Sequence, residues 1–261
     1  MSDEFVGVVK SVIRTVAPHV TVVDVTHGIP PHDVRAGALA LVRSVQYLQP
    51  GVVLAVVDPG VGTDRRAVAV AVGDPGEDDD EAFFFVGPDN GLLAAAVAMA
   101  GGAKVAVELT NASYHLPSPG LTFAGRDVFA PVAGHLCNGM GLSAFGPPVD
   151  PLTLRPGILP LSRREDGRLL AEVLWVDRFG NVQLNVGPEE ITAFGDTLAV
   201  RWGTDNLRTA RQANAYGDLK AGEVGLVTDS YGLVSLALDR RSAAEELRLR
   251  PGEAVTLEAP S

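Results

Sequence analysis

Disulfide chemistry and a basic surface are both missing from this sequence. Its single cysteine, Cys137, cannot build a disulfide framework or a thiolate metal cluster. The 21 basic residues, only three of them lysines, are outnumbered by 32 acidic ones, and the formal net charge is −11. A nucleic-acid-binding protein would instead carry a basic footprint. We therefore expect no nucleic-acid partner and no membrane partner.

Long apolar runs are missing as well. No stretch approaches the ~20 consecutive apolar residues of a membrane-spanning helix, and the N-terminus, Met-Ser-Asp-Glu, lacks the pattern of a signal peptide. We therefore expect a cytoplasmic protein. What the sequence does have is 46% hydrophobic residues over 261 positions. This is enough to form a core in one large domain or two modest ones.

Helix and strand patterns alternate through the first 150 residues. Apolar residues recur at helical spacing from Phe5 to Val16, with Asp3 and Glu4 expected in the first turn. Further helices are expected at 34–47, 92–100 and 129–138, and strands at 20–25, 52–57, 66–73, 83–86 and 105–109. Such alternation is typical of an α/β domain. The acidic stretch 76–81 is interpreted as a solvated loop rather than a metal site.

The pattern changes near Asp150. Five prolines between positions 147 and 160 indicate a linker. Short strands separated by glycine-containing turns follow, and they are expected at 168–176, 181–185, 197–202, 206–210, 224–228, 234–238 and 254–257. Closely spaced short strands favour a small β-barrel. The predicted organisation is an α/β N-terminal domain at residues 1–150, a linker at 151–165 and a C-terminal β-barrel domain at 166–261.

The stretch from Val52 to Arg66 is the first candidate for a site. Six consecutive apolar residues suit a strand buried on both faces, as in a parallel sheet. The strand ends at Asp58, and a turn rich in glycine brings Arg65 back within reach of that carboxylate. Ligands of open α/β sheets bind beyond the carboxyl ends of the strands. The alternative interpretation is a salt-bridged turn at a strand end.

Polar residues follow two other expected strands. Asp24 and His27 follow one, and Asp89 and Asn90 follow the other; packing a core does not require them there. His27 could join His32 and Asp33 as a metal ligand. No His-Glu-x-x-His or Cys/His spacing supports such a site. We therefore expect no metal, and interpret His27 as capping the turn.

Two glycine-containing motifs stand out later in the chain. In the stretch 122–136, Gly125 permits close backbone approach, and we interpret Asp127 as the N-cap of a helix with Arg126 as its salt-bridge partner. In the stretch 176–186, Phe179 and Asn181 flank a glycine between two strands. This pair could stack on a purine and hydrogen-bond it. The residues alone favour the simpler alternative, a hairpin turn capped by a short polar side chain.

Taken together, five blocks resemble the S-adenosyl-L-methionine (SAM) hydroxide adenosyltransferase family, the SAM hydrolases related to fluorinases and chlorinases. The blocks are D-V-T-H-G-I-P-P-H-D-V-R-A-G-A (24–38), V-D-P-G-V-G-T-D-R-R (57–66), F-V-G-P-D-N-G-L-L (85–93), T-F-A-G-R-D-V-F-A-P-V-A (122–133) and V-D-R-F-G-N-V (176–182). The resemblance extends from about Ser2 to Leu257. It implies an α/β domain joined to a β-barrel, and a homotrimer with sites between subunits.

The resemblance also implies a reaction. Water or hydroxide would attack C5′ of the ribose in SAM, giving adenosine and L-methionine. The sulfonium is already a good leaving group, so the protein needs to supply only a water oriented in line with the C5′–sulfur bond. No metal, redox group or other cofactor is implied, and SAM is the substrate.

Residue roles follow from the matched positions. Asp58 would orient the water and Arg65 would polarise it, and these are the catalytic candidates. Halogenating relatives lack this aspartate, so its presence favours hydroxide over halide. The substrate-binding candidates are Asp3, Asp177 and Ser230 at the methionine end, Asn181 at the adenine edge with Phe179 and Tyr216 packed on it, His32 over the ribose, and Asn90, Phe123 and Gly125 in the pocket.

The sequence departs from the family pattern at two places. Ala124 stands where the hydrolases have a histidine, and the loss of acid–base assistance typically costs ~10²–10⁴-fold. An engineered substitution and natural divergence both remain open. Family members also begin with a strand and a Thr-Asp-Phe-Gly turn before the segment matching Ser2-Asp3, and its aspartate binds the ribose diol. If the chain begins at Met1, we expect weaker SAM binding and an exposed sheet edge.

Three functions remain in order of preference. The first is a SAM hydrolase, either impaired by the two departures or fully active. The second is a catalytically weak protein that binds SAM or adenosine, and both departures motivate it. The third is a SAM-dependent halogenase, which would require chloride or fluoride as the nucleophile.

Overall fold

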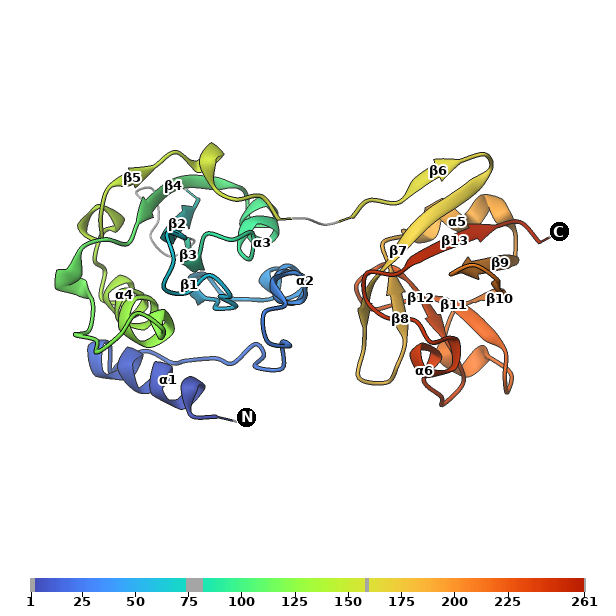
Figure 1. Cartoon of the computed structure of the whole chain (residues 1–261), viewed down its shortest axis with the longest axis horizontal. Helices are drawn as coiled ribbons and strands as arrows, with labels where there is room; N and C mark the ends of the chain where they lie inside the picture. The colour runs from blue at the N-terminus through green and yellow to red at the C-terminus, as the bar shows by residue number, and fades with distance from the viewer. Residues whose placement is uncertain (1–2, 74–81, 158–159, 261) are drawn as a thin grey trace. The chain divides into compact units, whose positions relative to one another are not determined.

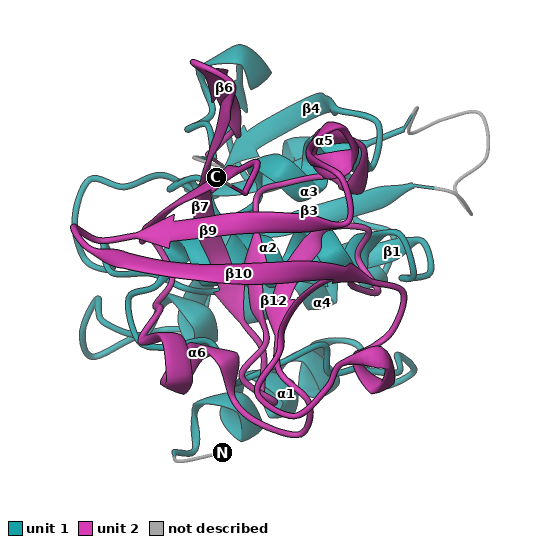
Figure 2. Cartoon of the chain, turned by 90° about the vertical axis from the view of Figure 1, so that its right-hand side faces the viewer, with its two compact units in different colours: residues 1–158 teal, residues 159–261 magenta. Residues whose placement is uncertain are grey.

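The computed structural model describes residues 3–73, 82–157 and 160–260, and the chain forms two compact units (Figures 1 and 2). The first unit comprises Met1–Ile158 and the second Leu159–Ser261. The acidic stretch 76–81 lies outside the described residues. The domain and linker boundaries given above stay a prediction.

A five-stranded sheet forms the centre of the first unit. Its strands, in spatial order, are β1 (Gly51–Leu54), β3 (Phe83–Pro88), β2 (Ala67–Val72), β4 (Ala103–Glu108) and β5 (Pro148–Val149). Only β1 and β3 pair in parallel, and the other pairs are antiparallel. The expectation of a buried parallel strand at 52–57 is therefore partly wrong. Among the described residues β1 pairs with β3 alone, its residues are half-buried, and Val56 is exposed.

Helices pack on both faces of this sheet. Val68, Val70 and Val72 of β2 join the core beneath α2 (Val34–Val45) and α3 (Ala94–Met99). The intervening Ala69 and Ala71 face the opposite core, which includes residues of α4 (Ala130–Cys137). α1 (Phe5–Val16) packs on α4, where a Cβ at Gly134 would lie 2.8 Å from that of Val16. The period-two burial of β2 thus explains its alternating valines and alanines.

Three local expectations for the first unit are wrong. Residues 20–25 form no strand: they pair with no neighbouring strand in the described chain, and Val23 is 74% exposed. Asp127 does not cap a helix, because a π-helical turn, η3 (Gly125–Phe129), precedes α4 and places Asp127 within it. Asp3 and Glu4 precede α1 rather than forming its first turn.

The second unit is a closed β-barrel, as predicted. Seven strands form the ring, and β13 pairs with both β9 and β7 to close it. In spatial order they are β13 (Ala254–Glu258), β9 (Thr197–Trp202), β10 (Asn206–Ala213), β11 (Val224–Thr228), β12 (Val234–Ala237), β8 (Val182–Leu184) and β7 (Arg168–Val176). The short β6 (Arg163–Glu165) extends β7 outside the ring. Alternate residues of these strands fill the barrel interior.

The helices α1 and α2 have 12 residues each, and the other helices of the described residues are shorter. Within residues 3–73, 82–157 and 160–260, none is long and apolar enough to cross a membrane.

Candidate functional site

Asp58 and Arg65 form a two-point ion pair just beyond β1. The Nε of Arg65 donates to Oδ1 of Asp58 at 3.0 Å, and its Nη2 donates to Oδ2. The Asp58 side chain is only 6% exposed and that of Arg65 12%. Forked guanidinium–carboxylate contacts fix orientation as well as distance. The sequence predicted that Arg65 lies within reach of Asp58, and in the structure the two side chains are in contact.

An aromatic ring holds the other side of the Arg65 guanidinium. The Cζ of Arg65 lies 5.5 Å from the ring centroid of Phe129. Phe129 is the last residue of η3 and is fully buried. Cations are attracted to aromatic faces at such distances. Phe129 was not among the predicted site residues, because its position in the sequence suggested only helix packing.

The Asp58 carboxylate keeps acceptor capacity despite this pairing. Two ionised oxygens offer about four lone-pair positions, and Arg65 takes one on each oxygen. A water molecule bound beside the pair can therefore donate a hydrogen bond to Asp58. The adjacent guanidinium supplies a positive charge at the same place.

Asn90 is tied to the residue before Asp58. Its Nδ2 donates to the backbone oxygen of Val57 at 2.9 Å, and its Oδ1 accepts from the backbone nitrogen of Leu92 at 3.1 Å. Both ends of the amide are thus engaged with backbone. Asn90 shapes this part of the unit by connecting the end of β3 to the end of the β1 segment.

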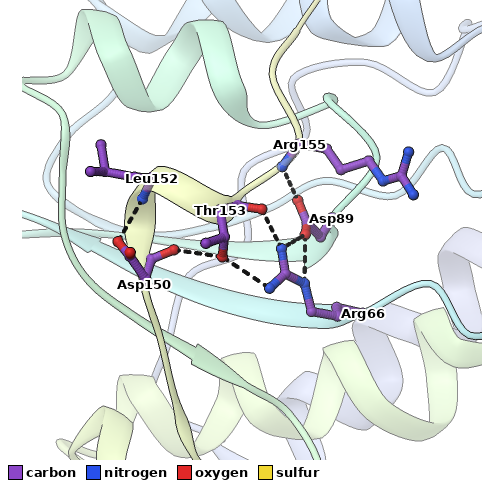
Figure 3. Close-up of polar contacts among 6 residues, drawn as sticks. All are labelled: Arg66, Asp89, Asp150, Leu152, Thr153 and Arg155. Carbon is purple, nitrogen blue, oxygen red and sulfur yellow. Dashed lines mark hydrogen bonds and ion pairs between the residues drawn. The ribbon is translucent and has the colours of Figure 1, made fainter.

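Arg66, the residue after Arg65, forms a second ion pair with Asp89, and sequence reasoning missed this pair (Figure 3). Arg66 donates through Nε and Nη2 to Oδ2 of Asp89 at 2.9 and 2.6 Å. The Asp89 side chain is 5% exposed, and its Oδ1 accepts from the backbone nitrogen of Arg155 at 2.7 Å. One signal in the sequence could have indicated this pair: Arg66 and Asp89 are each adjacent to a predicted site residue, Arg65 and Asn90.

The fourth sequence block, residues 122–133, forms the turn that supports Arg65. The ring of Phe123 lies 4.7 Å from that of Phe5, with the Arg126 guanidinium carbon 5.0 Å from its centroid. Gly125 is buried and begins η3. Ala124, the position of the family histidine, is half-buried and packs its methyl group against the apolar core. Arg126 and Asp127 form the expected salt bridge.

Asp3 and His32 are exposed in this structure. Oδ1 of Asp3 accepts from the backbone nitrogen of Phe5 at 3.3 Å, next to the start of α1. His32 has φ +67°, which is unfavourable for a residue with a Cβ and is tolerated mainly at constrained sites. In the described part of the chain, neither is hydrogen-bonded to Asp58 or Arg65.

The carboxylates near His27 are engaged with protein partners. Asp24 pairs with Lys10 and with Nε2 of His27, and the Lys10 hydrogen bond, followed by that of His27, lowers the pKa of Asp24. Asp33 caps α2 by accepting from Ala36. Across the residues that the structure describes, no three His, Cys, Asp or Glu side chains are grouped as metal ligands.

In the second unit, Asp177 organises the turn between β7 and β8. Its Oδ1 accepts from the backbone nitrogens of Phe179 and Asn181 at 2.8 and 2.9 Å, and its Oδ2 accepts from Nδ2 of Asn181 at 2.8 Å. The capped turn expected from the residues alone is therefore present. It leaves Phe179 71% exposed, with the guanidinium carbon of Arg178 5.6 Å from the centroid of its ring.

Asp229 organises a second turn, the one that carries Ser230. Its Oδ1 accepts from the backbone nitrogen of Tyr231, and its Oδ2 accepts from Ser235 at 2.9 Å and from Gln183 at 2.5 Å. Gln183 and Ser235 alternate with residues of the barrel core, so they lie on the outer face of the barrel. Sequence reasoning missed Asp229, although it adjoins Ser230.

Tyr216 lies near both turns. Burial raises the pKa of its hydroxyl, and the negative charges of Asp229 and Asp177 raise it further. The structure therefore gathers Asp177, Asn181, Tyr216 and the Ser230 turn in one region of the second unit. The Asp58 and Arg65 pair belongs to the first unit.

Two family models match the chain over most of its length. The SAM hydroxide adenosyltransferase N-terminal domain matches residues 1–146, and the C-terminal domain of the same family matches residues 171–256. An (R)-S-adenosyl-L-methionine hydrolase from Salinispora tropica is 42% identical over 259 residues, covering 99% of this chain and 94% of its own. Its counterpart from Thermus thermophilus is 38% identical over 264 residues, covering 98% and 95%.

More distant relatives and solved structures agree with these matches. A fluorinase from Nocardia brasiliensis is 27% identical over 288 residues, covering 98% of this chain and 92% of its own. The crystal structure of an uncharacterized conserved protein from Thermotoga maritima has a TM-score of 0.86 and 32% identity, covering 99% of this chain and 96% of that one.

Proposed function

Because this chain belongs to the SAM hydroxide adenosyltransferase family, we propose that it hydrolyses S-adenosyl-L-methionine to adenosine and L-methionine. The observation that carries the proposal is the buried Asp58–Arg65 pair, at the positions to which the family resemblance assigns the handling of water. The chain is 42% identical to a named hydrolase over 99% of its own length. A halide-binding site has no comparable support, because a carboxylate repels a halide.

The reaction is a direct displacement at C5′. The water oxygen forms a bond to C5′ while the C5′–sulfur bond breaks, and the electron pair of that bond moves to sulfur. The sulfonium becomes the neutral thioether of methionine, and one water proton leaves to solvent. Asp58 accepts a hydrogen bond from the water and orients it, and Arg65 polarises it. Orientation of this kind contributes much of the rate in reactions that need no acid.

Substrate recognition is assigned to the barrel residues. Asn181 reads the adenine edge, with Phe179 and Tyr216 packing on the base, and Asp177 and Ser230 hold the methionine end. The exposure of Phe179 and the fixed orientation of Asn181 by Asp177 support this assignment. Asp3, His32, Asn90, Phe123 and Gly125 are assigned to the rest of the substrate-binding region from the family match.

Adenosine production tests the proposal. The protein is incubated with each sulfonium epimer of SAM, because the relatives carry the (R) designation in their names, and products are separated by chromatography. Water labelled with ¹⁸O should place the label on the 5′-oxygen of adenosine. Added chloride or fluoride should yield no 5′-halo-5′-deoxyadenosine. Tight binding of SAM with no adenosine from either epimer, at high enzyme concentration, would replace the hydrolase with a binding protein.

A homotrimer in the cytoplasm is the proposed working form. Large apolar side chains are exposed on the single chain, and assembly would cover such surface. Examples are Leu121 (77%) and Leu152 (93%). The single cysteine is compatible with a reducing compartment.

A further inference from the structure

Six residues near the ends of β1, β2 and β3 form a closed ring. In order around the ring they are Val57, Asp58, Arg65, Arg66, Asp89 and Asn90. Three links are peptide bonds between consecutive residues, and three are side-chain contacts. The side-chain contacts are Asp58 with Arg65, Arg66 with Asp89, and Asn90 with the backbone of Val57. If one of the three side-chain contacts shifts, the other two contacts must therefore shift as well.

The Arg66–Asp89 contact is the most constrained of the three. A third segment fixes it, because Arg66 Nη2 donates to the backbone oxygen of Thr153 at 2.6 Å, and Nη1 donates to the Thr153 hydroxyl at 3.2 Å. Asp89 in turn accepts from the backbone of Arg155. Figure 3 shows the hydrogen bonds that connect the two charged groups to Thr153 and Arg155 of this segment. Both members of the pair are thus tied to the segment 153–155, Arg66 through Thr153 and Asp89 through Arg155.

Strand pairing alone does not require this ion pair. The backbone nitrogen of Asp89 already donates to the backbone oxygen of Arg66 at 2.9 Å, which continues the ladder of β2 and β3. Asp89 is buried and the Arg66 side chain is 29% exposed, and an ion pair taken out of water is often no more stabilising than apolar side chains of similar size. Its presence here fits a role in fixing the geometry of its neighbours better than a role in holding the strands together.

We propose that Asp89 and Arg66 are positioning residues for the hydrolysis. They hold Arg65 and Asn90 through the peptide bonds that connect them, and Asn90 holds the backbone next to Asp58. The Arg66–Asp89 pair therefore fixes the position of Arg65 through the peptide bond to Arg66, and the position of Asp58 through Asn90 and Val57. This inference rests on the proposed function. A displacement of about 1 Å in a reacting group can cost about 10²-fold in rate.

Asp89→Asn is the variant that tests the proposal. It keeps the size of the side chain and removes the charge that Arg66 binds. We expect kcat for SAM hydrolysis to fall about 10- to 100-fold, with KM within about twofold because the barrel residues are unchanged. The control is Asp150→Ala, which removes the Asp150 bond to Leu152 on the same segment and leaves Arg66 and Asp89 paired. Its kcat should match that of the unmodified protein.

Several outcomes would overturn the positioning role. One is a folded Asp89→Asn protein with unchanged kcat, and another is a loss that Asp150→Ala reproduces. If Asp89→Asn does not fold, kcat is measured for Arg66→Lys instead. Lysine keeps the positive charge but cannot make the two hydrogen bonds that Arg66 donates to Asp89. If the unmodified protein turns over no SAM, the proposed function fails separately. A crystal structure of the variant then judges the positioning role, since an undisturbed Asp58–Arg65 contact would contradict it.

Discussion

At the scale of single residues, Arg65 carries two constraints of different chemistry. The Asp58 carboxylate binds its edge and the Phe129 ring covers its face. Breaking a buried pair from one side leaves a buried charge without its partner, which typically costs about 3–5 kcal/mol. Any loss of activity in an Asp58 variant must therefore be separated from a loss of folded protein. Thermal unfolding and activity need to be measured on the same sample.

Ala124 offers a gain-of-function prediction at the same scale. Ala124→His introduces the side chain that the family resemblance implies at this position, so kcat should rise, by up to about 10²-fold if the histidine assists proton transfer. The pH dependence of kcat should then acquire a titration near 6.5.

Ala124→Asn is the matched control for the histidine variant. It adds a hydrogen-bonding group of intermediate size that does not titrate in this range. An equal gain in the control would mean that the position supplies only orientation. A histidine variant that is no faster than the unmodified protein would show that Asp58 and Arg65 suffice.

Glu223 gives a prediction about acid stability. Two bonds from Arg211, with one from the Lys220 backbone, lower the pKa of Glu223 from 4.5 to about 2. A depressed folded-state pKa stabilises the fold above the unfolded value, and that contribution is lost as pH falls from 4.5 through about 2. Glu223→Gln should thus lower Tm slightly near pH 7, where exposed pairs contribute little.

The difference in Tm between the unmodified protein and the Glu223→Gln variant should become smaller as the pH falls from 4.5 to about 2. Differential scanning fluorimetry across this range measures it. A difference in Tm that is independent of pH would show that packing of the side chain, rather than its charge, is responsible.

At the scale of elements, the turn between β7 and β8 depends on a glycine. Gly180 has φ +84°, and a Cβ there would lie 2.6 Å from Cα of Ser242, the N-cap of α6 (Ala243–Leu247). The backbone nitrogen of Ala244 also donates to the Gly180 oxygen. The turn that carries Phe179 and Asn181 is thus built against the start of α6.

Gly180→Ala should destabilise the protein and weaken substrate binding. Backbone strain costs of order 1–3 kcal/mol, and the contact with Ser242 adds to it because a backbone atom cannot rotate away. Unfolding in urea and the KM for SAM measure the two effects. Gly167→Ala is the matched control, with φ +76° and no atom within 4 Å of the added Cβ. Equal losses in both variants would leave the Ser242 contact without a role.

The same scale shows what the sequence could and could not predict. All seven barrel strands were expected, because alternating apolar residues and glycine turns are local signals. The strand expected at 20–25 was wrong because a strand needs a partner, which its own sequence does not specify. The Arg66–Asp89 pair was missed because its residues meet only in the β2–β3 register, where Ala67 lies opposite Pro88. Contacts set by register need pairing information that spacing alone does not contain.

At the scale of the whole molecule, the net charge of −11 and the exposed apolar residues make opposite demands. Charge repulsion favours separate chains, whereas covering apolar surface favours assembly. If the proposed trimer forms, the free energy gained by covering apolar surface must exceed the repulsion between the acidic chains. Light scattering should then give a mass three times the 27.2 kDa of one chain.

The trimer also predicts how activity depends on concentration. If the substrate sites lie between subunits, adenosine formation per chain should fall when the protein is diluted below the concentration at which trimers dissociate. Added salt screens the acidic charges and should shift that concentration downward. Activity per chain that stays constant through dissociation would show that each subunit carries a complete site. A monomeric mass at every concentration would remove the trimer from the proposal while leaving the hydrolase untouched.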